Sequence, residues 1–279
     1  MVADLHCHSK ISDGSLSIRE LAAAAKRLGI QALAIADHDT VDGIEEALKE
    51  CVKQGIKSIS AIEISGYDYK RNRKAHILGY LMDEPERIGD ACKFMLEQRQ
   101  QASRWAVEQI IQEGYPISWE LVEGLSKGST NVYKQHIMHG LMTLGYAVSI
   151  QDDLYKKLFA KPGDGMSGGI AYREIEYIDA AAAVKTIKEA GGIAVLAHPA
   201  GYKNLELIPE LVEAGLDGLE AWHPSHDEIE VKKIMDLAEK YDLILTGGSD
   251  FHGMYEDKAN PLGSRCINEE WLERLYLLK

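Results

Sequence analysis

The apolar positions of the first 83 residues switch between a strand period and a helix period, which predicts alternating strands and helices. Apolar runs typical of buried strands end at Leu5 and span 31–36, 58–64 and 75–81. Helical spacing over 17–29 and 42–52 separates the first three of these runs. Ser17, with Glu20 three residues later, has the pattern of a capping box at a helix start. We therefore expect an α/β fold.

The connection between the runs at 58–64 and 75–81 is only about ten residues long. A helical crossover between parallel strands needs about a dozen residues or more, so these two strands should pair antiparallel. The strand–helix alternation resumes near residue 179. It predicts helices at 179–190, 205–214 and 227–241 and strands at 193–197, 218–222 and 243–247.

Between these two parts, residues 84–176 carry only a helical pattern. Helices are predicted at 87–113, near Trp119, at 133–144 and at 152–159, followed by a glycine-rich stretch at 162–169. We therefore expect one barrel-like α/β domain, built from residues 1–83 and 177–279. A helical insertion domain, residues 84–176, should interrupt it.

The charge of the chain limits the kinds of partner that it can bind. With 31 basic and 44 acidic residues, its formal net charge is −13. A surface that binds nucleic acid over many phosphates needs a basic surplus, which the chain lacks. The helical insertion, with ten basic and thirteen acidic residues, lacks it as well. We expect local phosphate contacts and no extended nucleic-acid surface.

The sequence predicts a cytoplasmic protein without a membrane partner. The first residues show no basic region followed by an apolar stretch, so no signal peptide is expected. No apolar run approaches the ~20 residues that a membrane span needs. The four cysteines lie far apart, as is typical of reduced thiols: Cys7, Cys51, Cys92 and Cys266.

Histidine and carboxylate residues gather at the ends of the predicted strands. They are His6, His8, Asp13, the triplet Asp37-His38-Asp39, Glu63, His76, His198, Asp250 and His252. Two residues that are two positions apart on a strand share one face, so His6 and His8 can point at one ion. Since the strand ends of an α/β barrel converge on one cleft, residues far apart in sequence should become neighbours there.

This set of side chains predicts a metal centre. Mixed imidazole and carboxylate ligands suit Mn, Zn or Fe. Nine of these residues, all except Asp37 and Asp39, are plausible metal donors. They are more than one tetrahedral ion needs, so we expect two or three divalent metal ions about 3.5–4 Å apart. Such ions lower the pKa of bound water toward ~7 and clamp the oxygens of a phosphoryl group. The sequence therefore predicts a hydrolase.

The motifs resemble those of the PHP (polymerase and histidinol phosphatase) superfamily. They are H-x-H at 6–8 with Asp13, D-H-D at 37–39, Glu63, H-I-L-G-Y at 76–80, A-H-P at 197–199 and G-S-D-F-H-G at 248–253. N-V-Y-K-Q-H-I at 131–137 and H-P-S-H at 223–226 are similar to the TrpH/YciV-like nucleotide-phosphatase branch. The resemblance implies a distorted (β/α)7 TIM-like barrel with a helical insertion.

The resemblance also implies how the donors divide among the ions. One ion would take His6, His8, Glu63 and Asp250; a second, Asp13, His38 and His252; a third, Glu63, His76 and His198. Glu63 would then bridge two ions. Relatives with histidinol phosphatase activity often have histidine where this chain has Asp13, and a carboxylate there favours a harder ion such as Mn or Fe.

The activity implied by the resemblance is phosphomonoester hydrolysis on small nucleotides, either AMP-like 5′-phosphates or nucleoside 3′,5′-bisphosphates. Two segments depart from the family pattern: Ala200-Gly201-Tyr202 and Lys134-Gln135-His136 each lack an arginine that many relatives carry. Three alternatives stay open. They are a 5′–3′ exonuclease acting on short RNA or DNA ends, a histidinol phosphatase, and an amidohydrolase-type enzyme that cleaves C–N bonds.

A few further residues are candidates for contact with the substrate. Asp39 or His223 is a candidate for the acid that assists the leaving group. Candidates for substrate binding are Arg173, Lys134, His136 and His226. The basic run at 70–74 is expected to be a solvated turn.

Overall fold

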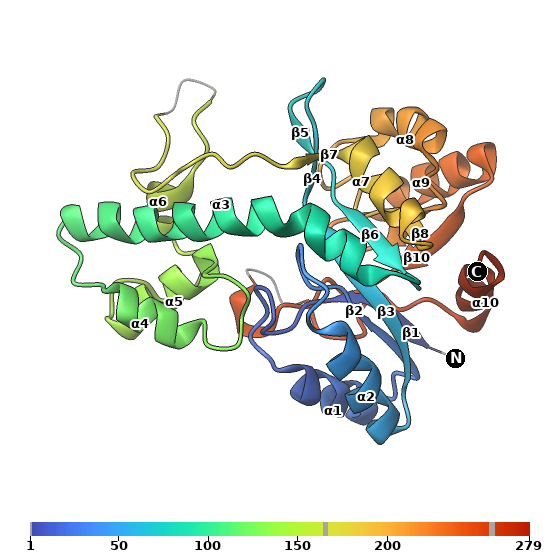
Figure 1. Cartoon of the computed structure of the whole chain (residues 1–279), viewed down its shortest axis with the longest axis horizontal. Coiled ribbons are helices and arrows are strands. Elements are labelled where there is room, and N and C mark those ends of the chain that lie inside the picture. Colours follow the sequence, from blue (N-terminus) through green and yellow to red (C-terminus); the bar gives the residue numbers. More distant parts are fainter. Residues whose placement is uncertain (1, 164–166, 257–259) are drawn as a thin grey trace.

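The computed structural model describes residues 2–163, 167–256 and 260–279, so part of the predicted glycine-rich stretch, residues 164–166, lies outside the described residues. Seven strands form the central sheet (Figure 1). In spatial order they are β1 (Ala3–Cys7), β2 (Ala32–Ile35), β3 (Lys57–Ile64), β6 (Ile77–Tyr80), β8 (Ile193–Leu196), β9 (Gly218–Trp222) and β10 (Ile244–Gly247). Strand β6 is antiparallel to β3, as predicted, and also to β8, whereas the other neighbours are parallel.

The sheet curves until its two edges nearly meet. The segment after β10 runs along β1, where Cys7 and Phe251 form a parallel bridge. The Asp250 backbone N–H donates to the His6 carbonyl at 2.7 Å, and the His8 N–H donates to the Phe251 carbonyl at 2.9 Å. These contacts confirm the predicted α/β fold with a distorted, barrel-like sheet of seven strands.

Six helices pack around the barrel: α1 (Ile18–Arg27), α2 (Ile44–Gln54), α7 (Ala180–Glu189), α8 (Ile208–Ala214), α9 (Glu228–Tyr241) and α10 (Glu269–Leu277). Two short 3₁₀ turns lie at Leu205–Leu207 and Gly253–Tyr255. The capping box predicted at Ser17 is present, because the Ser17 hydroxyl accepts from the Glu20 N–H while the Glu20 carboxylate accepts from the Ser17 N–H. Only α10 has no counterpart among the predicted helices.

Four helices between β6 and β7 extend to one side of the barrel, at the left of Figure 1. They are α3 (Pro85–Gln112), α4 (Trp119–Leu125), α5 (Lys134–Thr143) and α6 (Asp153–Phe159). Their apolar side chains form a separate core around residues such as Val107, Ile137 and Leu158, which Tyr255 joins from the segment after β10. The long helix α3 connects this group to the barrel. The domain boundaries at 83/84 and 176/177 stay a prediction.

A small three-stranded sheet was not predicted. It contains β4 (Gly66–Asp68), β5 (Arg73–Lys74) and β7 (Ile178–Asp179), with β4 in the middle. The basic run at 70–74 lies in its hairpin and is tied to neighbouring segments. Arg71 pairs with Asp68 and Glu210, and Lys70 pairs with Glu210 at 3.1 Å.

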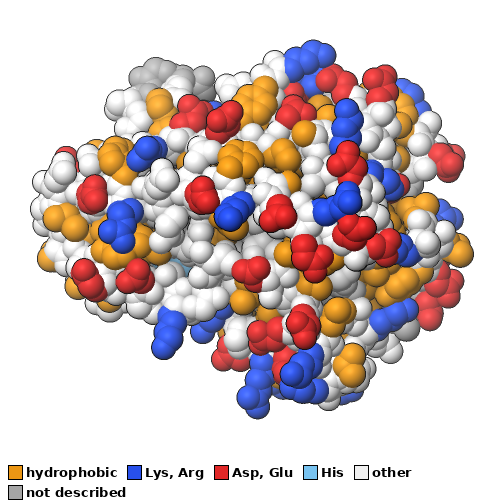
Figure 2. All heavy atoms as spheres, viewed as in Figure 1, with side chains coloured by type: hydrophobic (Ala, Val, Ile, Leu, Met, Phe, Trp, Pro, Cys, Tyr) orange, Lys and Arg blue, Asp and Glu red, His pale blue; other side chains and the backbone are white. Residues whose placement is uncertain are grey.

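Basic and acidic side chains are interspersed on the face shown in Figure 2, without a continuous basic area there. This distribution agrees with the net charge of −13. Among the described helices, none combines the length and the apolar composition that crossing a membrane requires.

Gly248, directly after β10, is needed for the approach of this segment to β1. A Cβ atom at this position would clash with the Cβ and the backbone nitrogen of His6. We expect Gly248→Ala to lower the free energy of unfolding by about 1–3 kcal/mol, measured by denaturant unfolding, because the strands must separate. Gly124→Ala in α4 is the control, since a Cβ there meets nothing within 4 Å. Equal losses in the two variants would contradict the prediction.

Candidate metal centre

Nine side chains converge at one end of the barrel, and we call them the donor cluster: His6, His8, Asp13, His38, Glu63, His76, His198, Asp250 and His252. Glu63 lies at its centre. The two carboxylate oxygens of Glu63 lie within 3.3 Å of a ring nitrogen of His6, His8, His38, His76 and His198. One carboxylate therefore faces five imidazoles from four different segments of the barrel, since His6 and His8 belong to the same one.

Asp250 and Asp13 lie on either side of this centre. Asp250 Oδ1 is 3.1 Å from His8 Nε2 and 3.4 Å from His6 Nε2. Asp13 Oδ1 is 3.4 Å from His252 Nε2. Among the described residues, the three carboxylates are thus each held by imidazoles and not by lysine or arginine, which leaves their charge available to a cation.

The donor cluster fits divalent metal ions. The donor atoms of His6, His8, Glu63 and Asp250 lie within 4.8 Å of one another, as do those of His8, Asp13, His38 and His252, and those of His38, Glu63 and His76. In addition, His8 Nδ1 is buried without a hydrogen-bond partner among the described residues, and His38 Nδ1, although it lies 3.2 Å from Glu63 Oε2, makes no hydrogen bond with it. Buried polar atoms normally have a partner, so these nitrogens point to a ligand. The assignment of individual donors to ions stays a prediction.

The charge state of the donor cluster favours the binding of a cation. Burial alone would raise the pKa of Glu63, but the imidazoles of His38, His6 and His76 outweigh it and hold that pKa well below its usual range. Burial lowers the pKa of His38 to about 4, so this imidazole is neutral at pH 7 and keeps a lone pair for a metal ion. The ionised Glu63 carboxylate beside the neutral imidazole of His38 is a donor pair that Mn, Zn and Fe accept.

The backbone is irregular at several of the segments that carry these side chains. The pairing of β1 with β2 shifts register between Asp4 and Cys7. Because side chains alternate along a strand, Cys7 packs with the core under α1 and α2, whereas His6 points into the donor cluster. His198 and Asp250 adopt positive φ angles of 30° and 49°, a conformation that residues other than glycine rarely take. Such strain is typical of functional sites.

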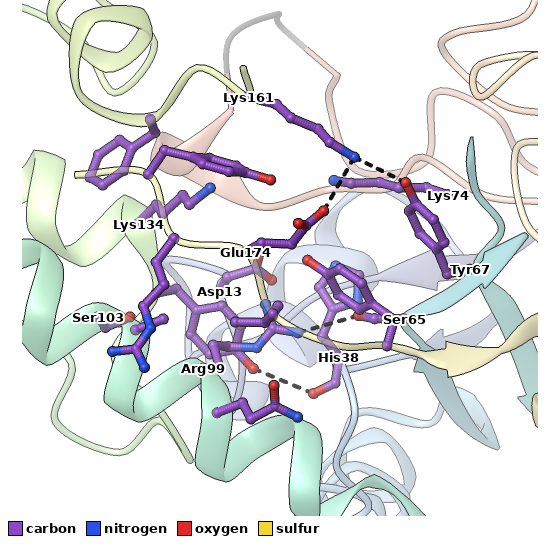
Figure 3. Close-up of a pocket in the computed structure, with 18 of the residues that line it drawn as sticks. Asp13, His38, Ser65, Tyr67, Lys74, Arg99, Ser103, Lys134, Lys161 and Glu174 are labelled. Atoms are coloured by element: carbon purple, nitrogen blue, oxygen red, sulfur yellow. Dashed lines mark hydrogen bonds and ion pairs between the residues drawn. The ribbon is translucent and has the colours of Figure 1, made fainter. Parts of the chain in front are cut away.

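The donor cluster forms one end of a cavity of about 1050 Å³. The walls away from the cluster come from β4, β5, α3, α5 and residues 171–177. They carry tyrosines and cations. Figure 3 shows Lys74 and Lys134 reaching into this space from opposite sides and Lys161 lying close to Tyr67.

Three cations of the cavity lack a carboxylate partner among the residues that the structure describes: Lys74, Lys134 and Arg173. Two other cations are paired. Lys161 lies 3.6 Å from Glu174, and Arg99 donates to Asp39 at 2.6 Å. Unneutralised positive charge in a cavity beside a metal-donor cluster favours an anionic ligand. Of the predicted substrate-binding residues, the structure therefore brings Lys134 and Arg173 into the cavity.

The two predicted acids are both engaged by protein groups. Asp39 is buried, accepts from the Ser65 backbone N–H at 2.7 Å and pairs with Arg99. His223 Nδ1 accepts from the Ser225 backbone N–H, so in the neutral ring Nε2 carries the proton and can donate to Asp250 Oδ2 at 3.2 Å. His223 does not line the cavity. The geometry gives His223 a contact that orients Asp250.

His136 and His226 do not line the cavity either. His136 is buried at the start of α5, where its Nδ1 accepts from the Tyr133 backbone N–H at 3.0 Å. Burial lowers the pKa of His136 to about 4, so this ring is neutral. His226 is buried, with its Nδ1 2.9 Å from the Ala221 carbonyl.

Sequence reasoning missed several residues of this site. Arg99, Lys161 and Tyr67 line the cavity, but nothing in their local sequence distinguishes them from other polar residues of a helix, loop or hairpin. Glu220 is fully buried beside His6. A signal for Glu220 existed, because a carboxylate in the middle of the apolar strand G-L-E-A-W requires a partner.

Comparisons with known proteins support the interpretation of the motifs. A family model described as a PHP domain matches residues 4–161. A phosphoribosyl 1,2-cyclic phosphate 1,2-diphosphodiesterase of Eggerthella lenta is 38% identical, over 91% of this chain and 95% of the relative. A 5′–3′ exoribonuclease of Haemophilus influenzae is 33% identical, over 89% of each chain. A 3′,5′-nucleoside bisphosphate phosphatase of Chromobacterium violaceum is 28% identical, over 89% of this chain and 86% of the relative.

The fold has a close counterpart among solved structures. A protein of Bifidobacterium adolescentis, described as a metal-dependent phosphoesterase, superposes with a TM-score of 0.88. It is 28% identical, and the match covers 99% of this chain and 96% of that protein. The resemblance predicted from the motifs is thus confirmed.

Proposed function

The chain belongs to the PHP domain family, and from that premise we propose that it is a metal-dependent phosphoesterase. Its substrate would be a small phosphorylated ribose compound that carries a second phosphate group. One observation carries this proposal. A single cavity joins the donor cluster to Lys74, Lys134 and Arg173, three cations without a carboxylate partner among the described residues.

The donor cluster would hold two or three divalent ions, with Glu63 shared between them because both of its oxygens face imidazoles. Bound ions would supply an activated water molecule and neutralise the oxygens of the reacting phosphoryl group. The protein's own contribution is to fix the donors. Glu63 and Asp250 are oriented by imidazoles, and Gln135 donates to Asp13 Oδ2 at 2.9 Å.

The second phosphate would lie against the unpaired cations. Lys74 and Lys134 approach from opposite sides of the cavity, so an anion between them can accept from both (Figure 3). Charge-assisted hydrogen bonds of this kind are about twice as strong as neutral ones. Binding at this end would orient the ester bond at the donor cluster, which is how a remote group contributes to the rate.

The relatives support a ribose compound with two phosphate groups. The Eggerthella lenta protein is named for a phosphoribosyl 1,2-cyclic phosphate, and the Chromobacterium violaceum protein for 3′,5′-nucleoside bisphosphates. The first name describes a phosphodiester and the second a phosphomonoester. Hydrolysis of nucleoside 3′,5′-bisphosphates, one of the activities implied by the motifs, is therefore one form of the proposal, and hydrolysis of a cyclic diester is the other.

The proposal is tested by following hydrolysis of a panel of substrates by the Mn-reconstituted protein with ³¹P NMR, because opening a cyclic diester forms a monoester and releases no inorganic phosphate. Phosphoribosyl 1,2-cyclic phosphate and adenosine 3′,5′-bisphosphate carry a second phosphate, whereas AMP and histidinol phosphate do not. We expect kcat/KM to be at least about 10-fold higher for one of the first pair, since one added charge-assisted contact contributes about 1.5–3 kcal/mol. His6→Ala is the inactive control. Preference for the monophosphates, or turnover only of 5′-phosphorylated oligoribonucleotides, would overturn the proposal.

Lys134 makes substrate binding dependent on pH. Burial, followed by the positive charges of Lys74 and Arg99, lowers the pKa of Lys134 to about 8. The rings of Phe159 and Tyr172 face its ammonium group at 5.4 and 5.7 Å. As the pH rises through 8, Lys134 loses its proton, so we expect KM for adenosine 3′,5′-bisphosphate to rise between pH 7 and 9.

The control for this pH effect is Lys134→Met, in which the step in KM near pH 8 should disappear. Lys74 faces the same space, and its pKa is also lowered by burial. If KM of Lys134→Met still increases at higher pH, that increase would reflect the loss of the proton from Lys74. An unchanged step near pH 8 in Lys134→Met would contradict the prediction.

A further inference from the structure

We propose that Glu220, in strand β9, is a positioning residue that holds His6 in the tautomer able to bind a metal ion. The proposal rests on the proposed function, because it concerns the same metal centre. Glu220 contacts the donor cluster but does not line the cavity.

Both oxygens of the Glu220 carboxylate are within hydrogen-bond distance of groups on other segments of the barrel. Oε1 lies 2.9 Å from His6 Nδ1 on β1. Oε2 accepts from the backbone N–H of His198, which lies two residues after the end of β8, at 2.9 Å. Glu220 and His6 are both fully buried, so no water competes for these contacts. One carboxylate therefore fixes two members of the donor cluster.

The contact with Glu220 determines which nitrogen of His6 is free. A carboxylate can only accept, so His6 Nδ1 must carry the hydrogen. In the neutral ring Nε2 then has a lone pair. This nitrogen points at the other donors, 3.3 Å from Glu63 Oε2 and 3.4 Å from Asp250 Oδ1. A metal-ligating histidine oriented by a carboxylate on its other nitrogen is a common arrangement in metalloproteins.

Glu220→Gln separates this role from simple packing, because glutamine has the same shape but one acceptor and one donor. The His198 backbone N–H is a fixed donor, so the amide oxygen must face it. The amide NH₂ then faces His6 Nδ1, which has to become the acceptor. His6 Nε2 would carry the hydrogen and could no longer bind a metal ion, although the fold keeps its contacts.

Asp217, beside the same strand, provides a control for this substitution. It directly precedes β9, and its Oδ2 accepts from the Ala194 backbone N–H of β8 at 2.8 Å. Asp217→Asn therefore makes the same chemical change at a carboxylate that also contacts the backbone of β8. It lies at the opposite end of β9 from the donor cluster.

The experiment measures Mn and Zn content per chain, and the dissociation constants by chelator competition, for the full-length protein. We expect Glu220→Gln to weaken one bound ion about 10–100-fold while Asp217→Asn leaves all ions unchanged. The melting temperature of the metal-free protein should stay close to that of the original chain. In a His6→Ala background, Glu220→Gln should cause no further loss, since it acts through His6.

The outcomes separate this proposal from the proposed function. If the original chain binds no divalent ion, the metal centre itself is wrong. If the original chain binds ions and Glu220→Gln binds them with the same affinity, only the role of Glu220 is overturned. An equal loss in Asp217→Asn, or a further loss in the His6→Ala background, would also overturn it, because the effect would then be structural.

Discussion

Replacing Glu63 by glutamine is expected to remove metal binding and to lower kcat by about 10³-fold or more. Five imidazoles face the Glu63 carboxylate, and its two oxygens belong to different donor groups. Glutamine keeps the shape of the side chain but not the charge, and it replaces one acceptor by a donor. The several kcal/mol that metal ions contribute to phosphoester hydrolysis would be lost with them.

The measurement is metal content by mass spectrometry together with the rate of hydrolysis of the best substrate. Glu176→Gln is the matched control, because Glu176 also lines the cavity but lies outside the donor cluster. It should keep both metal and activity. A Glu63→Gln protein that retains its full metal content, with a circular dichroism spectrum like that of the original chain, would contradict a bridging role for Glu63.

The order of strands and helices could be predicted because each element of the barrel carries its own periodic pattern. The buried run of β2 and the capping box at Ser17 are local signals that tertiary contacts reinforce. The antiparallel pairing of β6 with β3 followed from the short connection between them. Strands β4, β5 and β7 could not be predicted, since two or three residues of mixed polarity show no period.

The metal donors were predictable for a topological reason, whereas the cavity walls were not. Parallel strand ends must meet at one rim, so polar residues at those ends become neighbours whatever the details of packing. The walls instead depend on how α3 and α5 lie across the barrel mouth. On α5, Lys134 and Gln135 reach the cavity while His136 turns into the helical core. A step of one residue rotates a helical side chain by about 100°, which a motif alone does not resolve.

The double variant Lys74→Met/Lys134→Met is expected to lower kcat/KM for a substrate with two phosphate groups by about 10²–10⁴-fold. Each lysine would donate a charge-assisted hydrogen bond to the second phosphate, and such bonds contribute about 1.5–3 kcal/mol each. Methionine preserves most of the apolar stem, so packing in the cavity changes little. Adenosine 3′-monophosphate, which lacks the second phosphate, should be hydrolysed by the variant and the original chain with similar kcat/KM.

The control for the double variant is Lys93→Met/Lys127→Met, which removes two exposed lysines of the helical insertion that do not line the cavity. If net charge alone steered the substrate, both double variants would lose activity to the same extent. High salt would then abolish the loss of each variant relative to the original chain. If Lys74 and Lys134 bind the second phosphate, only their loss matters, and it matters only for the bisphosphate. An equal loss on both adenosine substrates would place these lysines at the reacting phosphate instead.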